Sequence, residues 1–417
     1  MADLSLDSLH DLRSGRTPWQ QFGALPELDR DHPAHLSCDA VIVGAGITGA
    51  FMAERLTRRG LKLVILDRLQ PERASTAAST ALLLWETDAP LRELEDRLGF
   101  DGAAAVFRRT HAAVREIGDL VAALGIDCGL APRDSLYLSG DRLDPADLRE
   151  EHALRRAAGL AGALLDPGGV ARLGLCAEAA LLSPGAAQAD PVALASGLMQ
   201  AAQARGALLL SPLEAVAYDA SARGIAVATD RGTQITGKAL ILATGYDMPP
   251  CVPSTAHRLL STWVVATAPL PPESLWPSGA LVWEASDPYL YMRTTSDRRI
   301  IAGGADAPIV DAAARDALTA RKVGELLNRV AARFRPIEPA QLAYVWSGVF
   351  GETRDALPLI GALPGMPGCY AAFGYGGNGI TFSAIAAEMI DRLLRGERDP
   401  HQAAFALDRA VSGRRAI

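Results

Sequence analysis

The sequence predicts an α/β (α+β) protein with a parallel sheet and a second region that is rich in strands. Three observations support this fold class. A strand–helix–strand unit with a glycine-rich turn occupies residues 39–67. A helix that begins at Asp190-Pro191 precedes a series of short strands, and residues 258–304 are again rich in strand-forming residues. A chain of 417 residues is too long for one simple core, so two domains are expected.

The turn within residues 39–67 has the spacing G-x-G-x-x-G, formed by Gly44, Gly46 and Gly49. The apolar run at residues 40–43 is typical of a buried strand, and a helical pattern follows the turn. In such a unit the first glycine permits a sharp turn, and the second lets the backbone approach a pyrophosphate. The third lets the helix pack closely on the strand.

Asp67 ends the second apolar strand of this unit, residues 61–66, about 20 residues after the first glycine. A carboxylate at this place can accept hydrogen bonds from both ribose hydroxyls of a dinucleotide. The helix N-terminus offers N–H groups and partial positive charge to the phosphates. The alternative is a tight turn without a ligand, but strand, turn, helix, strand and acid in this order favour dinucleotide binding.

The composition excludes several other classes of protein. Hydrophobic residues make up 49% and charged residues 21% of the chain, and its formal net charge is −7, so nothing indicates nucleic-acid binding. No apolar run reaches the roughly 18 residues of a membrane span, and the polar first residues are not typical of a targeting peptide, so a cytoplasmic location is expected. The five cysteines and seven histidines are scattered, so no metal site is expected.

A second glycine-rich turn, residues 374–381, connects a short strand to a predicted helix at about 379–394. The N–H groups of Gly376, Gly377 and Asn378 would point positive potential at a ligand before the helix. The alternative is a plain strand–helix corner, which is common in α/β proteins. The sequence has no second complete G-x-G-x-x-G unit, so one dinucleotide is expected.

Four motifs together resemble the flavin amine and amino-acid oxidases related to D-amino-acid oxidase, glycine oxidase and sarcosine oxidase. They are the N-terminal unit, the small-residue loop 74–83, the strand ending at 243–245 and the C-terminal turn. The resemblance spans about residues 38–396 in order. It implies FAD as the cofactor. It also implies a Rossmann-like FAD-binding domain assembled from discontinuous segments, with a smaller antiparallel-sheet substrate domain covering the flavin.

The resemblance also divides the chain into segments. The expected division is an N-terminal arm (1–36), the FAD-binding domain (37–90, 185–250 and 340–400), the substrate or cap domain (91–184 and 251–339) and a C-terminal tail (401–417). Within the cap domain, residues 311–334 are predicted to be helical.

The resemblance implies FAD contacts along the whole chain. The residues that match the adenosine half of the cofactor are Gly44, Gly46, Ile47, Thr48 and Gly49 at the phosphate turn, Asp67 and Arg68 at the ribose and adenosine, and Leu213 at the adenine. Ser75, Thr76, Thr80, Ala81 and Leu82 match the loop at the pyrophosphate and flavin edge, and Gly245 lies at the end of the strand that closes at residues 243–245. The residues that match the segment under the flavin pyrimidine ring are Gly376, Gly377, Asn378, Gly379, Ile380 and Thr381.

The substrate site departs from the family pattern. Phe350 occupies the position of an arginine that binds the substrate carboxylate in glycine oxidase and D-amino-acid oxidase, and Gly377 stands where glycine oxidase has a second arginine. A buried carboxylate without a partner is costly, so a small α-amino acid in the usual pose is not expected. Tyr289, Tyr291 and Arg293 share one face of a strand, and Arg293 is then an alternative anchor. The other interpretation is a half-exposed strand facing solvent.

The family chemistry is oxidation of the C–H bond beside nitrogen, with hydride transfer to flavin N5 and formation of an imine. This requires orientation and desolvation but no obligatory side-chain acid or base. The substrate is then an amine or an amino-acid derivative. The residues expected at the reacting end are Tyr291, Arg293, Phe350 and Tyr375, with Trp85, Tyr289 and Trp346 as further pocket candidates. Each aromatic residue taken singly is equally explained by core packing.

The same comparison predicts non-covalent FAD. Gly348 stands where sarcosine oxidase has its flavin-linked cysteine, and loop 74–83 has no histidine of the kind that other branches use. Residues 298–302 also lack the lysine associated with oxygen reactivity. Three hypotheses therefore remain: an oxidase that uses oxygen, a dehydrogenase that passes electrons to a quinone or carrier protein, and an FAD-holding subunit without turnover.

Overall fold

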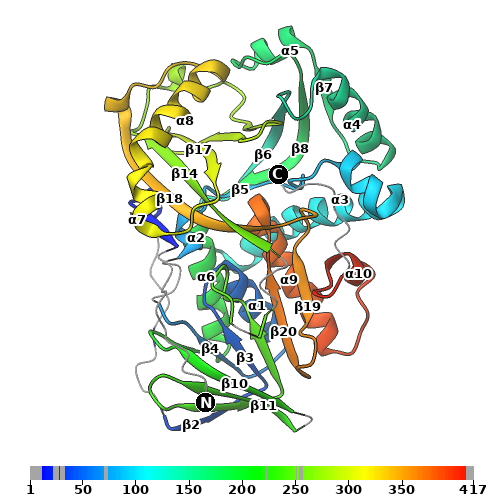
Figure 1. The fold of residues 1–417 in the computed structure, drawn as a ribbon, viewed down its shortest axis with the longest axis vertical. Helices are drawn as coiled ribbons and strands as arrows, with labels where there is room; N and C mark the ends of the chain where they lie inside the picture. Colours follow the sequence, from blue (N-terminus) through cyan, green and yellow to red (C-terminus); the bar gives the residue numbers. More distant parts are fainter. Residues whose placement is uncertain are drawn as a thin grey trace.

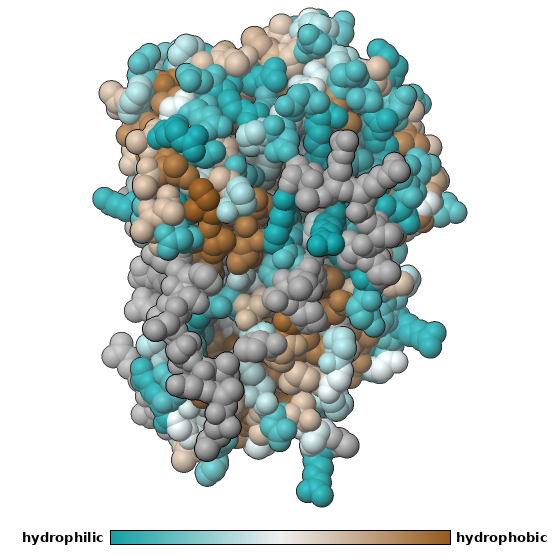
Figure 2. Space-filling model, viewed as in Figure 1, coloured by the Kyte–Doolittle hydropathy of each residue, from teal (hydrophilic) through white to brown (hydrophobic). Residues whose placement is uncertain are grey.

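The computed structural model describes residues 12–21, 28, 33–69, 74–221, 223–249, 251–252 and 257–409. The predicted N-terminal arm and C-terminal tail lie partly outside these residues. A large sheet with its helices forms the upper half of the molecule in Figure 1, and two further sheets form the lower half. Hydrophobic surface gathers in the band between the two halves on the face shown in Figure 2.

The G-x-G-x-x-G turn belongs to a six-stranded sheet with the order β19-β20-β13-β3-β4-β9. Five strands are parallel, and β19 pairs antiparallel with β20 at one edge. The strands are β3 (Ala40–Val43), β4 (Leu63–Leu66), β9 (Leu208–Leu210), β13 (Ala239–Leu242), β19 (Leu359–Ala362) and β20 (Cys369–Phe373). Every residue of β3, β4 and β13 is buried, as expected of parallel strands covered on both faces.

One face of this sheet is covered by helices. Helix α1 (Ile47–Arg58) packs against α6 (Pro191–Ala204) and α9 (Gly379–Leu394), which places both glycine-rich turns at neighbouring helix starts. The other face packs on a four-stranded sheet with the order β10-β11-β12-β2. Its strands are β2 (His35–Ser37), β10 (Ala215–Ser221), β11 (Gly224–Thr229) and β12 (Gln234–Gly237).

The ten-stranded sheet of the upper half has the order β1-β18-β14-β17-β16-β15-β6-β8-β5, with β7 paired to β8. It receives strands from both segments expected in the cap domain and also β1, β5 and β18 from outside them. Its strands are β1 (Arg13–Gly15), β5 (Leu82–Leu83), β6 (Ala131–Leu138), β7 (Ala163–Leu165), β8 (Ala180–Gln188), β14 (His257–Thr267), β15 (Leu281–Glu284), β16 (Leu290–Thr294), β17 (Ile300–Ala307) and β18 (Leu342–Thr353).

The remaining helices lie around these sheets. They are α2 (Ser75–Ala78), α3 (Leu91–Leu124), α4 (Pro145–Ala157), α5 (Pro167–Arg172), α7 (Ala312–Ala317), α8 (Thr319–Arg333), α10 (Gln402–Phe405) and the 3₁₀ turns η1 (Pro18–Gln21), η3 (Pro272–Ser274), η4 (Pro339–Gln341) and η5 (Gly376–Asn378). The long α3 is kinked at Gly99, whose φ is +69°. The single helix predicted at 311–334 is two helices in the structure, α7 and α8, with Leu318 between them.

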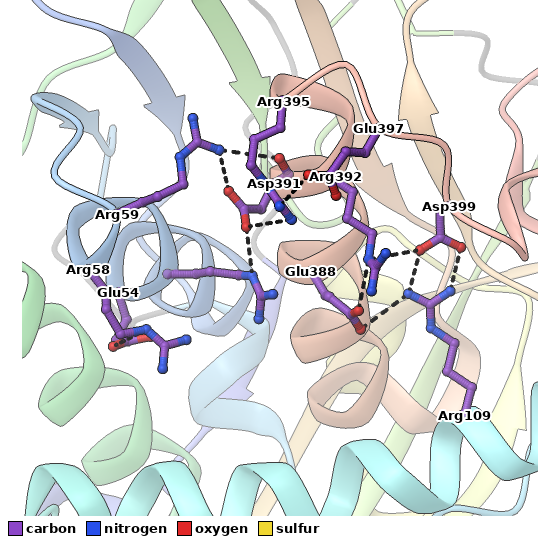
Figure 3. A network of polar contacts seen from close by, with 11 residues as sticks. Glu54, Arg58, Arg59, Arg109, Glu388, Asp391, Arg392, Arg395, Glu397 and Asp399 are labelled. Carbon is purple, nitrogen blue, oxygen red and sulfur yellow. Dashed lines mark hydrogen bonds and ion pairs between the residues drawn. The ribbon is translucent and has the colours of Figure 1, made fainter.

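A network of ion pairs fixes α9 against its neighbours (Figure 3). Arg109 of α3 donates to both oxygens of Asp399, at 2.6 and 2.9 Å. On the other side of α9, Asp391 accepts from Arg55 of α1 at 3.2 Å and also pairs with Arg59. Burial alone would raise the pKa of Asp399, but the hydrogen bonds and charge of Arg109 outweigh it and lower that pKa. The network therefore holds the C-terminal part of α9, and the segment that follows it, against α1 and α3.

Candidate active site

A cavity of about 900 Å³ lies between the upper and lower sheets and takes lining residues from both. Asp67 and Leu213 line it beside the parallel sheet. Tyr289 and Tyr291 line it from the large sheet. Both glycine-rich turns open into the space between these residues, so one cavity connects every motif that the sequence singled out.

The phosphate turn requires glycine at two positions for steric reasons. Gly44 has φ +109°, and a Cβ there would lie 2.2 Å from the carbonyl oxygen of Ala243. A Cβ on Gly49 would lie 1.9 Å from the carbonyl oxygen of Gly44. The first glycine thus permits the turn against β13, and the third permits close packing of α1 on β3, as the motif predicts.

The start of α1 is held by side chains from two other segments. The N–H of Ile47 donates to Thr76 Oγ1 at 3.0 Å, which brings the loop 74–83 against the helix N-terminus. Thr48 Oγ1 is 2.8 Å from Ser383 Oγ of α9 and donates to Tyr375 Oη at 3.3 Å. The two glycine-rich helix starts are therefore directly connected, although they are far apart in the sequence.

Asp67 marks the adenosine end of the cavity. Its carboxylate accepts from the N–H of Ala45 at 2.7 Å and from that of Leu69 at 2.8 Å. Burial raises the pKa of Asp67, and these N–H donors oppose the increase. The N–H of Leu213 donates to the Asp67 carbonyl at 2.8 Å, and Arg68 forms an ion pair with Asp247.

Eighteen of the residues predicted to hold FAD line the cavity. They are Gly44, Gly46, Ile47, Thr48, Asp67, Arg68, Ser75, Thr76, Thr80, Ala81, Leu82, Leu213, Gly245, Gly376, Gly377, Asn378, Gly379 and Ile380. Gly49 and Thr381 were also predicted to bind FAD, but they do not line it. Gly49 is used for helix packing, and the Thr381 hydroxyl donates to the Leu84 carbonyl at 2.8 Å.

The C-terminal turn holds a carboxylate that the sequence did not reveal. Asp88 Oδ2 accepts from the N–H of Gly377 at 2.7 Å. The Asn378 amide donates to the Glu86 carbonyl at 2.9 Å and to Asp88 Oδ1 at 3.5 Å. Burial raises the pKa of Asp88 to about 6, and the Gly377 N–H opposes the increase. The positive end of the turn thus already faces an acid.

Aromatic residues surround the other end of the cavity. Tyr291, Phe350 and Tyr375, which were predicted there, all line it, as does Tyr289. The rings of Tyr289 and Tyr291 are 5.5 Å apart. Two further lining residues, Thr262 and Trp283, were not predicted. The hydroxyls of Thr262 and Tyr291 are 3.4 Å apart, which fixes the tyrosine side chain.

Arg293 does not face the cavity, so the prediction that it anchors a substrate carboxylate is wrong. Its side chain is 2% exposed, donates to the Ala189 carbonyl at 3.0 Å and lies 5.1 Å from the centre of the Trp19 ring. Strand alternation correctly places Arg293 on the same face as Tyr291. The cavity ends before Arg293, however, because Trp19 of the N-terminal arm covers that part of the sheet.

The core-packing interpretation holds for two other pocket candidates. Trp85 and Trp346 are each 1% exposed, and neither lines the cavity. The indole N–H of Trp85 donates to the Pro184 carbonyl, and that of Trp346 donates to the Ala78 carbonyl, each at 2.9 Å. Both side chains support the cavity wall from behind.

Fold and cavity together are those of a protein that binds a dinucleotide cofactor. Residues 39–393 match a family model described as "DAO: FAD dependent oxidoreductase". The chain therefore belongs to the DAO family of FAD-dependent oxidoreductases, and FAD is its cofactor.

Two curated relatives cover most of the chain. Glycine oxidase of Geobacillus kaustophilus is 26% identical over 396 residues, which are 89% of this chain and 97% of that protein. Gamma-glutamylputrescine oxidoreductase of Escherichia coli is 26% identical over 373 residues, which are 87% of this chain and 85% of that protein.

Solved structures show the same fold. The crystal structure of glycine oxidase from Geobacillus kaustophilus superposes with a TM-score of 0.72 and 22% identity, over 90% of this chain and all of that one. L-amino acid deaminase from Proteus vulgaris superposes with a TM-score of 0.72 and 16% identity, over 93% of this chain and all of that one. These matches confirm the predicted mixed α/β architecture.

The described part of the chain lacks two further features. Its helices include none with the length and apolar character of a membrane span. Within the same residues, no three His, Cys, Asp or Glu side chains are grouped as metal ligands.

Proposed function

We propose that the protein oxidises the C–H bond beside the nitrogen of an amine, which yields an imine that water hydrolyses. The observation that carries this proposal is the continuity of the cavity from the phosphate turn to an aromatic chamber. Bound FAD would supply the hydride acceptor. Two curated relatives are named for oxidation of an amino acid and of an amine derivative, which supports the same class of substrate.

The residues present fit FAD in a non-covalent form. The start of α1 and the glycines beside it suit a pyrophosphate, and Asp67 suits a ribose. Among the described residues, the exposed large hydrophobic side chains are Leu69 and Val216, and both line the cavity near Asp67, where an adenine would cover them. Among the described residues, those that line the cavity include neither Cys nor His. A covalent bond between the flavin and a Cys or His side chain is therefore not supported.

The chain's own contribution to the reaction is binding, orientation and exclusion of water. Tyr289, Tyr291 and Trp283 form walls that desolvate the reacting nitrogen, which must be neutral for its lone pair to assist departure of the hydride. The Thr262 hydroxyl fixes Tyr291. Correct positioning of two reacting groups is worth several kcal/mol of a reaction barrier, so no acid–base residue is required.

The electron acceptor and the location of the protein stay predictions from the sequence. The described lining residues include no lysine, which supports a quinone or a carrier protein over oxygen as the acceptor. A cytoplasmic location is proposed from the composition alone.

Anaerobic mixing of the FAD-loaded protein with a panel of amines and amino acids tests the proposal. We expect at least one amine to remove the yellow absorbance of the flavin, while simple α-amino acids leave it unchanged. If every amine fails, the result contradicts the proposed reaction and favours an FAD-holding subunit without turnover. Adding oxygen or a soluble quinone after bleaching then identifies the acceptor from the rate at which the colour returns.

A further inference from the structure

The aromatic end of the cavity is acidic. Among the described lining residues, Arg68 is the single basic side chain, and it pairs with Asp247 near the adenosine end. Glu86 and Asp88 line the opposite end. The side chains available to hold a substrate there thus carry negative charge or no charge.

Asp88 is built into this end of the cavity. A Cβ on Gly376 would lie 1.9 Å from Asp88 Oδ2, so glycine at this position makes room for the carboxylate. The Gly377 N–H fixes the same oxygen at 2.7 Å. Asp88 forms no ion pair with any side chain of the described residues, so the Gly377 N–H is its main partner, and the charge of Arg142 acts on it more weakly.

Further carboxylates contribute negative charge near this end of the cavity, although Asp306 and Glu352 do not line it. Asp88 lies near Tyr289, because a Cβ on Gly377 would be 2.9 Å from Asp88 Oδ1 and 3.5 Å from Tyr289 Oη. The pKa of Tyr289 is raised first by burial and then by the charges of Asp306, Asp88 and Glu352. Oδ1 of Asp306 is buried without a hydrogen-bond partner. Oε2 of Glu86 is buried without one as well, and the Glu86 side chain lies in the cavity wall.

Only part of this charge is compensated. Arg155 lies 3.5 Å from Glu86 and is shared with Glu151, and Glu352 pairs with Arg258. No ion pair to Asp88 or Asp306 is formed among the described residues. Asp88 and Asp306 are partly buried, and a ligand that covers such carboxylates from water without supplying a cation would leave them in a costly state. Their presence at a binding cavity therefore indicates a positively charged ligand.

We propose that the substrate is a cation: an amine that carries a second, protonated amino or guanidinium group, with this group held by Asp88 and by the ring faces of Tyr289 and Tyr291. The inference rests on the proposed function and specifies its substrate class. A carboxylate attracts the charged group directly, and aromatic faces attract cations when water is excluded. The reacting nitrogen stays neutral while the second nitrogen keeps its proton.

The first experiment measures binding without turnover. The FAD-loaded protein is titrated with choline and with 3,3-dimethylbutan-1-ol, its uncharged isostere, and changes in the flavin absorbance are followed. We expect choline to bind at least tenfold more tightly. Equal affinity for the two probes would overturn the proposal.

Variants test whether Asp88 and Asp306 cause the preference for choline over its uncharged isostere. Asp88→Asn keeps an acceptor for the Gly377 N–H but removes the charge, and it should reduce the choline preference to less than about threefold. Asp306→Asn should reduce it in the same direction. Asp297→Asn, in an exposed turn paired with Arg299, is the matched control and should keep the preference. If Asp88→Asn does not retain FAD, Asp306→Asn and the wild-type titration still decide the question.

The second experiment compares oxidation of butane-1,4-diamine, 4-aminobutan-1-ol and 4-aminobutanoate. We expect the rate of anaerobic flavin bleaching at low substrate concentration to fall at least tenfold from the first to the second and further to the third. If amines bleach the flavin without this order, the cation proposal fails while the proposed function stands. If choline is preferred but no amine bleaches the flavin, the cation site stands and the proposed function fails.

Discussion

At the residue scale, single carboxylates decide how the cavity recognises its ligands. Asp67 receives two backbone N–H groups and was recognisable from its place at the end of the second strand. Asp88 accepts a hydrogen bond from the N–H of Gly377, which lies 289 residues away in the sequence. Local sequence patterns do not predict a contact between residues so far apart. Arg293 shows a second limit of prediction from sequence. Strand alternation predicts the face on which a side chain lies, but it does not predict where a cavity on that face ends.

Replacing Asp67 tests the adenosine end. Asp67→Ala removes the acceptor of two N–H groups and the expected partner of the ribose, which should weaken FAD binding by about 1–3 kcal/mol, or roughly ten- to a hundredfold in Kd. The measurement is a fluorescence titration of the apoprotein with FAD, with circular dichroism as a control for folding. Unchanged affinity in a folded variant would refute the ribose assignment.

The charge of Asp88 makes cation binding depend on pH. Its pKa is raised to about 6, so the carboxyl is neutral below that pH and ionised above it. The charged groups around it are Glu352, which raises the pKa, and Arg142, which lowers it, with Asp306 and Tyr289 nearby. The affinity for choline, whose charge does not titrate, should rise between pH 5 and about 8 and then level off, because burial also raises the pKa of Asp306, to about 7. A flat profile, or a decrease over this range, would contradict the role of Asp88.

At the element scale, local sequence signals predicted helices better than sheets. Asp190 caps α6 through the N–H groups of Val192 and Ala193, and α9 spans the predicted residues 379–394. Capping residues and glycines act within a few positions, so a single sequence reveals them. The entry of β1, β5 and β18 into the large sheet depends on pairing between distant segments, which local patterns do not encode.

Two glycine-to-alanine changes separate the effect of a steric clash from the effect of glycine on helix propensity. Gly49→Ala places a Cβ where the Gly44 carbonyl oxygen lies, and it should destabilise the protein by about 3 kcal/mol. Gly324→Ala in α8 meets no atom within 4 Å and should stabilise it by up to about 1 kcal/mol. Urea unfolding measures both. Similar effects of the two changes would mean that close packing does not require glycine at position 49.

The ion pair between α3 and the segment after α9 gives a second prediction at this scale. Arg109→Ala leaves the Asp399 carboxylate, whose side chain is 1% exposed, without its main partner, and it should cost about 3 kcal/mol of the free energy of unfolding. The double change with Asp399→Ala should recover part of that loss. Lys238→Ala, which breaks an exposed pair with Asp39, should have no measurable effect. Equal stability of Arg109→Ala and wild type would show that the network does not hold α9.

At the scale of the whole molecule, the cavity exists because two sheets of different kinds meet. The six-stranded sheet carries the phosphate turn and Asp67, and the ten-stranded sheet carries Tyr289 and Tyr291 at and beside β16. The sequence motifs predicted the parallel sheet and most residues along the cavity, since each motif carries its own signal. The resemblance implied a smaller antiparallel sheet, but the sheet found there is the larger one, with ten strands against six. The sequence did not predict the acidity of the aromatic end, because that property arises only when strands and turns from separate segments come together.

The most direct test of the central claim, that both glycine-rich helix starts hold one dissociable FAD, is the flavin content of the purified protein before and after denaturation. One FAD per chain is expected after incubation with excess cofactor, and denaturation followed by filtration should release all of it from the polypeptide. A protein that stays colourless after this incubation, or flavin that remains attached to the unfolded chain, would contradict the account.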